Sequence, residues 1–242
     1  AFCATLRGAR LRSDVIFATS TPLTIALPAV LAARKQGVPM VFEVRDLWPQ
    51  VPIAVGALRH PVAIWLARRL ELLAYRGAAH VICLSSDMRG VIEGTGYPAD
   101  RLSVIPNACD TDFFDVPAER GVEFRARYPW LGDRPLVAYT GAIGLINGLE
   151  YMVRLAAATS RRNPDIRFLV VGTGREEALV RGLAVELGVL NRNFFMLPPM
   201  PKAEMPAVLS AATIATSFVI KVPETWANSA NKFFDGLAAG RP

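Results

Sequence analysis

The loop at residues 139–148 has the composition of a phosphate-binding turn. It connects an apolar, β-branched run to an amphipathic helical pattern, and it contains Gly141, Gly144 and Asn147. Glycine lets backbone N–H groups approach a ligand closely, and a helix that begins near Gly148 adds the positive end of its dipole. The sequence therefore predicts phosphate contact here; the alternative is a tight strand-to-helix turn without a ligand.

A second loop of the same kind contains Gly172, Gly174 and Arg175. A dinucleotide-binding fingerprint would require a third small residue where Glu177 stands, and carboxylates in the first helical turn repel a pyrophosphate. We therefore expect no NAD or FAD. Arg175 is still a candidate for the lining of a ligand cleft.

The last helical pattern begins with a further candidate anion site. Asn228, Ser229 and Asn231 offer N-caps and free backbone N–H groups, which favour an anion at a helix start. Lys232 is unfavourable against the helix dipole, a cost that a bound phosphate would offset. Asp235, about one turn further on, could accept a hydrogen bond from a sugar hydroxyl. An ordinary capped helix with a solvated lysine and aspartate is the alternative.

Charged residues follow a buried strand pattern in the first half of the chain. Arg45 and Asp46 stand at its carboxyl end, where open α/β sheets bind ligands, so both are candidate catalytic residues. The turn at residues 20–22 lies on the same rim. A structural ion pair would explain the two charges without catalysis, and Trp48 is more typical of a core position than of a stacking platform.

The elements that must position these residues alternate along almost the whole chain. Expected strands are 14–19, 40–44, 80–84, 102–105, 136–140, 167–171, 193–197 and 213–217, and expected helices are 23–35, 61–75, 87–93, 149–161, 176–187, 203–211 and 231–239. Such alternation is typical of βαβ units and parallel sheets. A proline-containing break between residues 107 and 134 divides the pattern. We predict an α/β protein with two Rossmann-like, doubly wound domains, 1–117 and 118–242, facing a central cleft.

Composition narrows the class of protein further. No apolar run is long enough to span a bilayer, and the sequence has only two histidines and the scattered cysteines Cys3, Cys83 and Cys109. We therefore expect a cytoplasmic protein without a metal site or a disulfide framework. The net charge of +6 suits phosphate-bearing ligands. No basic run is interleaved with aromatics in the manner of nucleic-acid binders.

The helical pattern at residues 59–76 has an apolar stripe beside Arg68, Arg69 and Arg76. Packing of the stripe against the sheet is the interpretation we favour. The alternative is contact with anionic lipid, which would place the protein at the inner face of the plasma membrane.

Six segments carry a family resemblance: DVI at 14–16, FEVRDLWP at 42–49, VIPNACD at 104–110, YTG at 139–141, VVGTG at 170–174 and NKFFDGLAAGRP at 231–242. In this order and spacing they resemble glycosyltransferase family 4, a group of retaining enzymes with the GT-B fold. The nearest similarity is to the fucosamine-transferase-like enzymes of bacterial O-antigen and capsule clusters. The resemblance extends over essentially the whole chain, and the order of the segments is more specific than any one of them.

The resemblance implies a nucleotide-sugar donor, UDP-linked by preference, bound mostly by the second domain. Its diphosphate would lie against the loop at 141–148 and the start of the last helix, without a metal ion or other cofactor. The nucleobase would lie near Met196, with Lys202 just beyond, and Asp235 would hold the ribose. The acceptor, a saccharide or a polyprenyl-diphosphate-linked molecule of surface polysaccharide synthesis, would bind mostly to the first domain.

The chain departs from the family pattern near its acidic pair. Ala227, not glutamate, stands eight residues before Asp235, and Glu224, eleven residues before, is the candidate catalytic replacement. The chain also begins in what reads as mid-domain and stops after a helix that should lead to a further strand. We therefore expect little activity from these 242 residues alone.

A second departure concerns cations. The arginine and lysine of the family's first glycine loop fall at Ala142 and Asn147, which leaves Lys232, with Arg175 or Lys202, to neutralise phosphate.

Two other functions fit the expected architecture less well. A nucleotide-sugar 2-epimerase would need a catalytic histidine or a close pair of carboxylates in the cleft, and the sequence identifies neither. A non-enzymatic two-domain sugar binder would have several chain crossings between domains, whereas we expect a single linker between residues 110 and 134.

Overall fold

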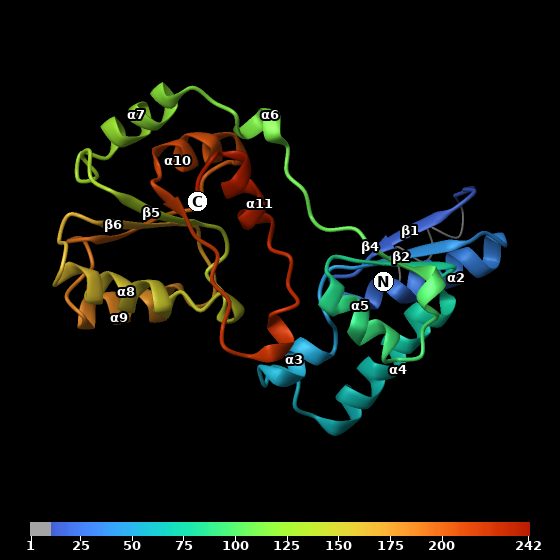
Figure 1. The fold of residues 1–242 in the computed structure, drawn as a ribbon. Coiled ribbons are helices and arrows are strands. Elements are labelled where there is room, and N and C mark those ends of the chain that lie inside the picture. The colour runs from blue at the N-terminus through green and yellow to red at the C-terminus, as the bar shows by residue number, and fades with distance from the viewer. Residues whose placement is uncertain (1–10) are drawn as a thin grey trace. The chain divides into compact units, whose positions relative to one another are not determined.

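The computed structural model describes residues 11–242, which form two compact units. The first unit comprises the described residues up to Asn107 together with Lys221–Ser229, and the second comprises Ala108–Ile220 and Ala230–Pro242. Each unit contains one four-stranded parallel sheet (Figure 1).

The first unit has the strand order β1-β2-β3-β4. The strands are β1 Ile16–Thr19, β2 Met40–Val44, β3 His80–Cys83 and β4 Leu102–Val104, and the helices between them are η1 Leu23–Ile25, α2 Ala26–Gln36, α3 Gln50–Ala54, α4 Pro61–Gly77, α5 Ser86–Glu93 and η2 Ala99–Arg101. Phe42 and Val81, paired across β2 and β3, are fully buried in the core together with Tyr75 of α4. Parallel strands connected by helices place all their carboxyl ends at one edge, so this edge gathers the loops of the unit.

The second unit has the strand order β7-β6-β5-β8. Its strands are β5 Leu136–Thr140, β6 Arg167–Val171, β7 Phe194–Leu197 and β8 Ile214–Ala215, and its helices are α6 Thr111–Phe114, α7 Ala118–Arg127, η3 Leu145–Asn147, α8 Glu150–Ser160, α9 Glu177–Glu186, η4 Lys202–Glu204, α10 Met205–Ala211 and α11 Asn231–Ala238. Successive side chains of β6 enter different cores: Phe168 joins one cluster and Leu169 the other. Helices α8 and α9 cover one face of the sheet, and α7 and α10 the other (Figure 1). The sheet is therefore doubly wound.

The strand pattern read from the sequence is confirmed, with three of the eight strands matching at both ends. The break at 107–134 is less irregular than we expected, because it contains α6 and the ten-residue α7. The apolar stripe of α4 is also only partly explained by packing. Leu70 and Leu73 pack against the core, but Val62, Trp65 and Leu66 are 57%, 55% and 55% exposed.

The expected single linker is wrong. We placed the boundary near Pro117, whereas the compact units divide after Asn107, and residues 221–229 return to the first unit before the chain re-enters the second. Ala227 is buried in the core of the first unit, where its carbonyl accepts a hydrogen bond from Ser85 Oγ at 2.8 Å. The carbonyl of Ser229 accepts a bond from Asn107 Nδ2. Chain crossings therefore give no argument against the two-domain binder.

Membrane-spanning helices and metal-ligand clusters are both absent from residues 11–242. None of their helices combines the length and apolarity of a membrane span. No group of three or more metal-ligating side chains occurs within this range. Cys83 and Cys109 are free thiols, while Cys3 lies outside the described residues.

Candidate functional site

The centre of the candidate site in the second unit is the ammonium group of Lys232, in the first turn of α11. Its Nζ donates to Tyr139 Oη at 2.7 Å and lies 4.4 Å from the centre of the same ring. With the Asn147 amide oriented to satisfy both its ends, Asn147 Oδ1 also accepts from Nζ at 3.3 Å, and Nδ2 donates to the carbonyl of Ala142 at 2.9 Å. Three of the predicted positions, Gly141, Asn147 and Lys232, thus lie together.

Lys232 has no carboxylate partner among residues 11–242: no acidic oxygen lies within 4 Å of its nitrogen. Burial lowers the pKa of Lys232 to about 8, and burial also raises the pKa of Tyr139. A desolvated ammonium favours an anion as its neighbour. Lys232 also lies at the start of a helix, where the positive end of the helix dipole favours an anion as well.

Gly141 is required by the approach of this lysine. Its φ of +133° is a conformation that side-chain-bearing residues rarely adopt, and a Cβ there would lie 3.2 Å from Lys232 Cε. Its backbone N–H donates to the carbonyl of Val171 at 3.0 Å. The glycine therefore serves both the lysine and the contact with the second loop.

The two glycine loops are joined to each other through their backbones. Ile143 N donates to Thr173 O at 3.0 Å, and Glu176 N donates to Ile143 O at 3.0 Å. A Cβ on Gly172 would lie 1.9 Å from the carbonyl oxygen of Gly141, and a Cβ on Gly174 would lie 2.3 Å from that of Ile143. Packing between the loops thus explains why Gly172 and Gly174 are glycines. It also uses the backbone N–H groups of Ile143 and Glu176, whereas the sequence had suggested that N–H groups of these loops bind phosphate.

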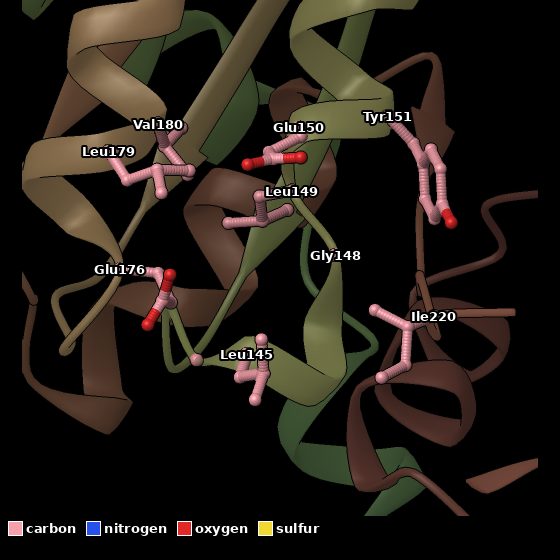
Figure 2. Close-up of a pocket in the computed structure, with 10 residues that line it drawn as sticks. Leu145, Gly148, Leu149, Glu150, Tyr151, Glu176, Leu179, Val180 and Ile220 are labelled. Atoms are coloured by element: carbon pink, nitrogen blue, oxygen red, sulfur yellow. The ribbon is translucent and has the colours of Figure 1, made fainter. Parts of the chain in front are cut away.

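The two sides of the first glycine loop differ in charge. On one side, a cavity of about 100 Å³ has an apolar lining with two carboxylates, Glu150 and Glu176 (Figure 2). On the other, a cavity of about 200 Å³ is lined by Gly141, Ala142, Val171, Gly172, Thr173, Pro199, Met200 and Met205. Carboxylates repel phosphate, so the side with Gly141, which also contacts Lys232, is the side suited to a nucleotide.

The start of α11 differs from the expected capped helix. Its N-cap is Ala230, and no side chain makes a cap hydrogen bond. Asn228 and Ser229 belong to the first unit, with Asn107 bound to the carbonyl of Ser229. The predicted caps are therefore wrong, and of the residues predicted in this motif Asn231, Lys232 and Asp235 lie in α11 itself.

Four other predicted donor residues, Asp235, Lys202, Arg175 and Met196, also belong to the second unit. Burial raises the pKa of Asp235, with Lys202 acting in the opposite direction, and Lys202 Nζ lies 5.4 Å from the centre of the Phe113 ring. Arg175 is exposed after the second glycine loop, and Met196 is half-buried in β7. Pro199 and Met200, which we had not singled out, line the cavity instead.

In the first unit, polar side chains gather after β1 and β2. Thr21 Oγ1 donates to Asp46 Oδ2 at 3.0 Å, Arg45 Nη2 donates to Asn107 Oδ1 at 3.2 Å, and Arg45 Nη1 lies 3.7 Å from Glu43 Oε2. Arg45 therefore forms the structural ion pair that we gave as the alternative, but its partner is Glu43 and not Asp46. Trp48 packs partly against the core, as expected. Glu224, in η5 Pro223–Thr225, lines a different cavity, beside Gln50 and Glu71.

Comparison with known proteins shows similarity to glycosyltransferases. Residues 1–108 match the Glycosyl transferase 4-like domain. The chain is 33% identical over 149 residues to the alpha-D-kanosaminyltransferase of Streptomyces kanamyceticus, covering 60% of this chain and 37% of that one. It is 28% identical over 222 residues to the 2-deoxystreptamine glucosyltransferase of the same organism, covering 89% and 54%.

The solved structure of Anabaena HepE in complex with UDP-glucose matches with a TM-score of 0.77 at 16% identity, over 100% of this chain and 61% of that one. The two parallel sheets with their helices are thus a GT-B fold, as predicted. The chain is a homologue of glycosyltransferases and spans about a third to a half of the length of the two Streptomyces enzymes.

Proposed function

We propose that the protein containing this chain transfers a sugar from a UDP-linked donor to a hydroxyl group of an acceptor, with retention of configuration. The homology to glycosyltransferases supports sugar transfer, and the Anabaena neighbour was solved with UDP-glucose. Surface polysaccharide synthesis, with a saccharide or lipid-linked acceptor, is the pathway we propose on the family resemblance.

One observation carries the donor assignment: Lys232 is a half-buried ammonium at a helix start, beside a glycine loop and without an acidic partner within the described chain. We assign to it the diphosphate, with the uridine in the cavity bounded by Gly141 and Met200. As the bond to the sugar breaks, negative charge grows on the leaving diphosphate. The ammonium and the dipole of α11 would stabilise that charge where it develops.

The test is calorimetric titration with UDP. Lys232→Ala should weaken binding about 10- to 100-fold, the effect of one charge-assisted hydrogen bond. Lys35→Ala removes an equal charge from the exposed end of α2 and should leave affinity unchanged. Absence of UDP binding by the wild-type protein, or an unaffected Lys232→Ala variant, would refute the donor assignment.

We further propose peripheral contact with a membrane through α4. Its exposed Val62, Trp65 and Leu66 lie on a helix that also carries Arg68, Arg69 and Arg76, and Arg69 lies 5.2 Å from the centre of the Trp65 ring. Apolar side chains beside arginines suit the interface of an anionic bilayer.

A further inference from the structure

The first unit contains a cavity of about 490 Å³ that the donor site does not use. Its lining comes mostly from α3, α4 and η5, with Pro49 and Thr95 beside them, and it includes Gln50, Arg68, Glu71 and Glu224. Helix α3 packs directly on η5, so the segment 221–229 completes the wall of the cavity. Three charged side chains in one lining suggest a polar ligand.

Glu71 is the buried charge of this cavity, with only 4% of its surface exposed. Its Oε1 accepts from Gln50 Nε2 at 2.8 Å and from Tyr75 Oη at 3.3 Å. Within residues 11–242, no cationic nitrogen lies within 4 Å of its carboxylate. Burial raises the pKa of Glu71, and the hydrogen bonds from Gln50 and Tyr75 and the charge of Arg68 oppose this only in part. A buried carboxylate of this kind is stabilised by a cation.

Gln50 presents an unsatisfied acceptor beside Glu71. Because its Nε2 donates to Glu71, the orientation of the amide is fixed, and its Oε1 is buried without a hydrogen-bond donor in the described chain. Buried acceptors are almost always satisfied in folded proteins. A ligand that carries N–H or O–H donors would satisfy Gln50 Oε1 while it lies beside the carboxylate of Glu71.

The charges at the cavity decide between classes of ligand. Glu71 and Glu224 outnumber Arg68, so the lining carries an excess of one negative charge. A phosphorylated or carboxylated ligand would be repelled, and a neutral sugar would leave the carboxylate of Glu71 without a counter-charge. A protonated amine supplies three donors and a positive charge.

We propose that this cavity binds the ammonium group of a polyhydroxylated amine, either an amino sugar or an aminocyclitol, against Glu71 and Gln50. The remaining hydroxyls of the ligand lie toward Glu224 and Arg68. The inference rests on the proposed transferase function only in assigning this ligand as the acceptor. Binding itself requires no donor and no catalysis.

The test compares three probes of similar size: glucosamine, glucose and N-acetylglucosamine. Titration of the full-length protein should give at least about tenfold tighter binding of glucosamine than of either neutral sugar. Glu71→Gln, which preserves shape and removes the charge, should abolish that preference. Asp100→Asn removes an exposed carboxylate of the same unit that does not line the cavity, and it should preserve the preference.

Glu224→Gln is the second variant, for the case in which Glu71→Gln does not fold. Because Glu224 is exposed, its substitution should not affect folding, and it should reduce the preference for glucosamine a few-fold. Equal binding of glucosamine and glucose would overturn the proposal, as would an unchanged preference in a folded Glu71→Gln protein. An equal loss in Asp100→Asn would show a general charge effect and would also overturn it. UDP titration of the same samples reports on the second unit, so failure of the donor assignment is distinguishable from failure here.

Discussion

The affinity for UDP should fall as pH rises through 8, because binding uses the charged form of Lys232. Burial lowers the pKa of that ammonium to about 8 in the free protein. A diphosphate against Nζ would return its pKa toward the ordinary value of about 10.4. Binding between these two pH values must therefore take up a proton. A terminal phosphate titrates near pH 6 and contributes little above pH 7.

The size of the effect follows from the pKa. About 90% of Lys232 is charged at pH 7 and about 10% at pH 9, so the association constant should drop about tenfold, or ~1.4 kcal/mol. Calorimetry in two buffers of different ionisation enthalpy should show proton uptake rising from near zero at pH 7 toward one proton at pH 9. In Lys232→Met both the pH dependence and the uptake should disappear. A wild-type affinity that is flat between pH 7 and pH 9 would refute the reasoning.

The same pKa predicts a stability difference without ligand. The folded pKa of Lys232 is depressed, so between about pH 8 and pH 10.4 the unfolded chain binds more protons than the folded chain. The free energy of unfolding contributed by this residue therefore rises with pH in that window. The difference between wild type and Lys232→Met in denaturant titrations isolates this contribution.

Two further predictions concern packing and the membrane. Gly172→Ala should lower the free energy of unfolding by about 3 kcal/mol, because its Cβ would overlap the Gly141 carbonyl. Gly182→Ala, in open space on α9, should raise the free energy of unfolding by about 0.5–1 kcal/mol. Urea denaturation measures both values, and equal effects of the two variants would contradict the role of Gly172 in joining the loops. Trp65→Ser should reduce co-sedimentation with phosphatidylserine vesicles several-fold at physiological salt. Trp226→Ser, which replaces an equally exposed tryptophan, should leave co-sedimentation unchanged. Equal co-sedimentation of the two variants would show that the α4 surface does not contact the membrane.

Much of the fold could be predicted because local pattern and tertiary environment agree in the strands. The interior strand β6 is apolar at nearly every position and buried on both faces, so its run of residues 167–171 is unambiguous. Helix α7 was missed because its mean composition is polar and only Gly121 and Phe124 are buried. Prolines on either side of it resemble a linker more than a helix.

The site was harder to predict because its contacts are long-range. Lys232 meets Tyr139 across 93 residues of sequence, and no local pattern reports that distance. Gly172 and Gly174 belong to a motif that we recognised in the sequence. Glycine is required at both positions because the first glycine loop packs against them, and not because a ligand does. Glu71 carried no signal in the sequence, since a glutamate in an amphipathic helix is usually solvated; only the structure shows it buried.

The return of residues 221–229 to the first unit has a practical consequence for recombining these enzymes. A hybrid protein joined only after Asn107 would import nine foreign residues into the host's first unit, including the position of Ala227 in its core. Grafts of a second unit should therefore keep the host's own residues 221–229. Hybrids that replace residues 221–229 together with the second unit should misfold in the first unit.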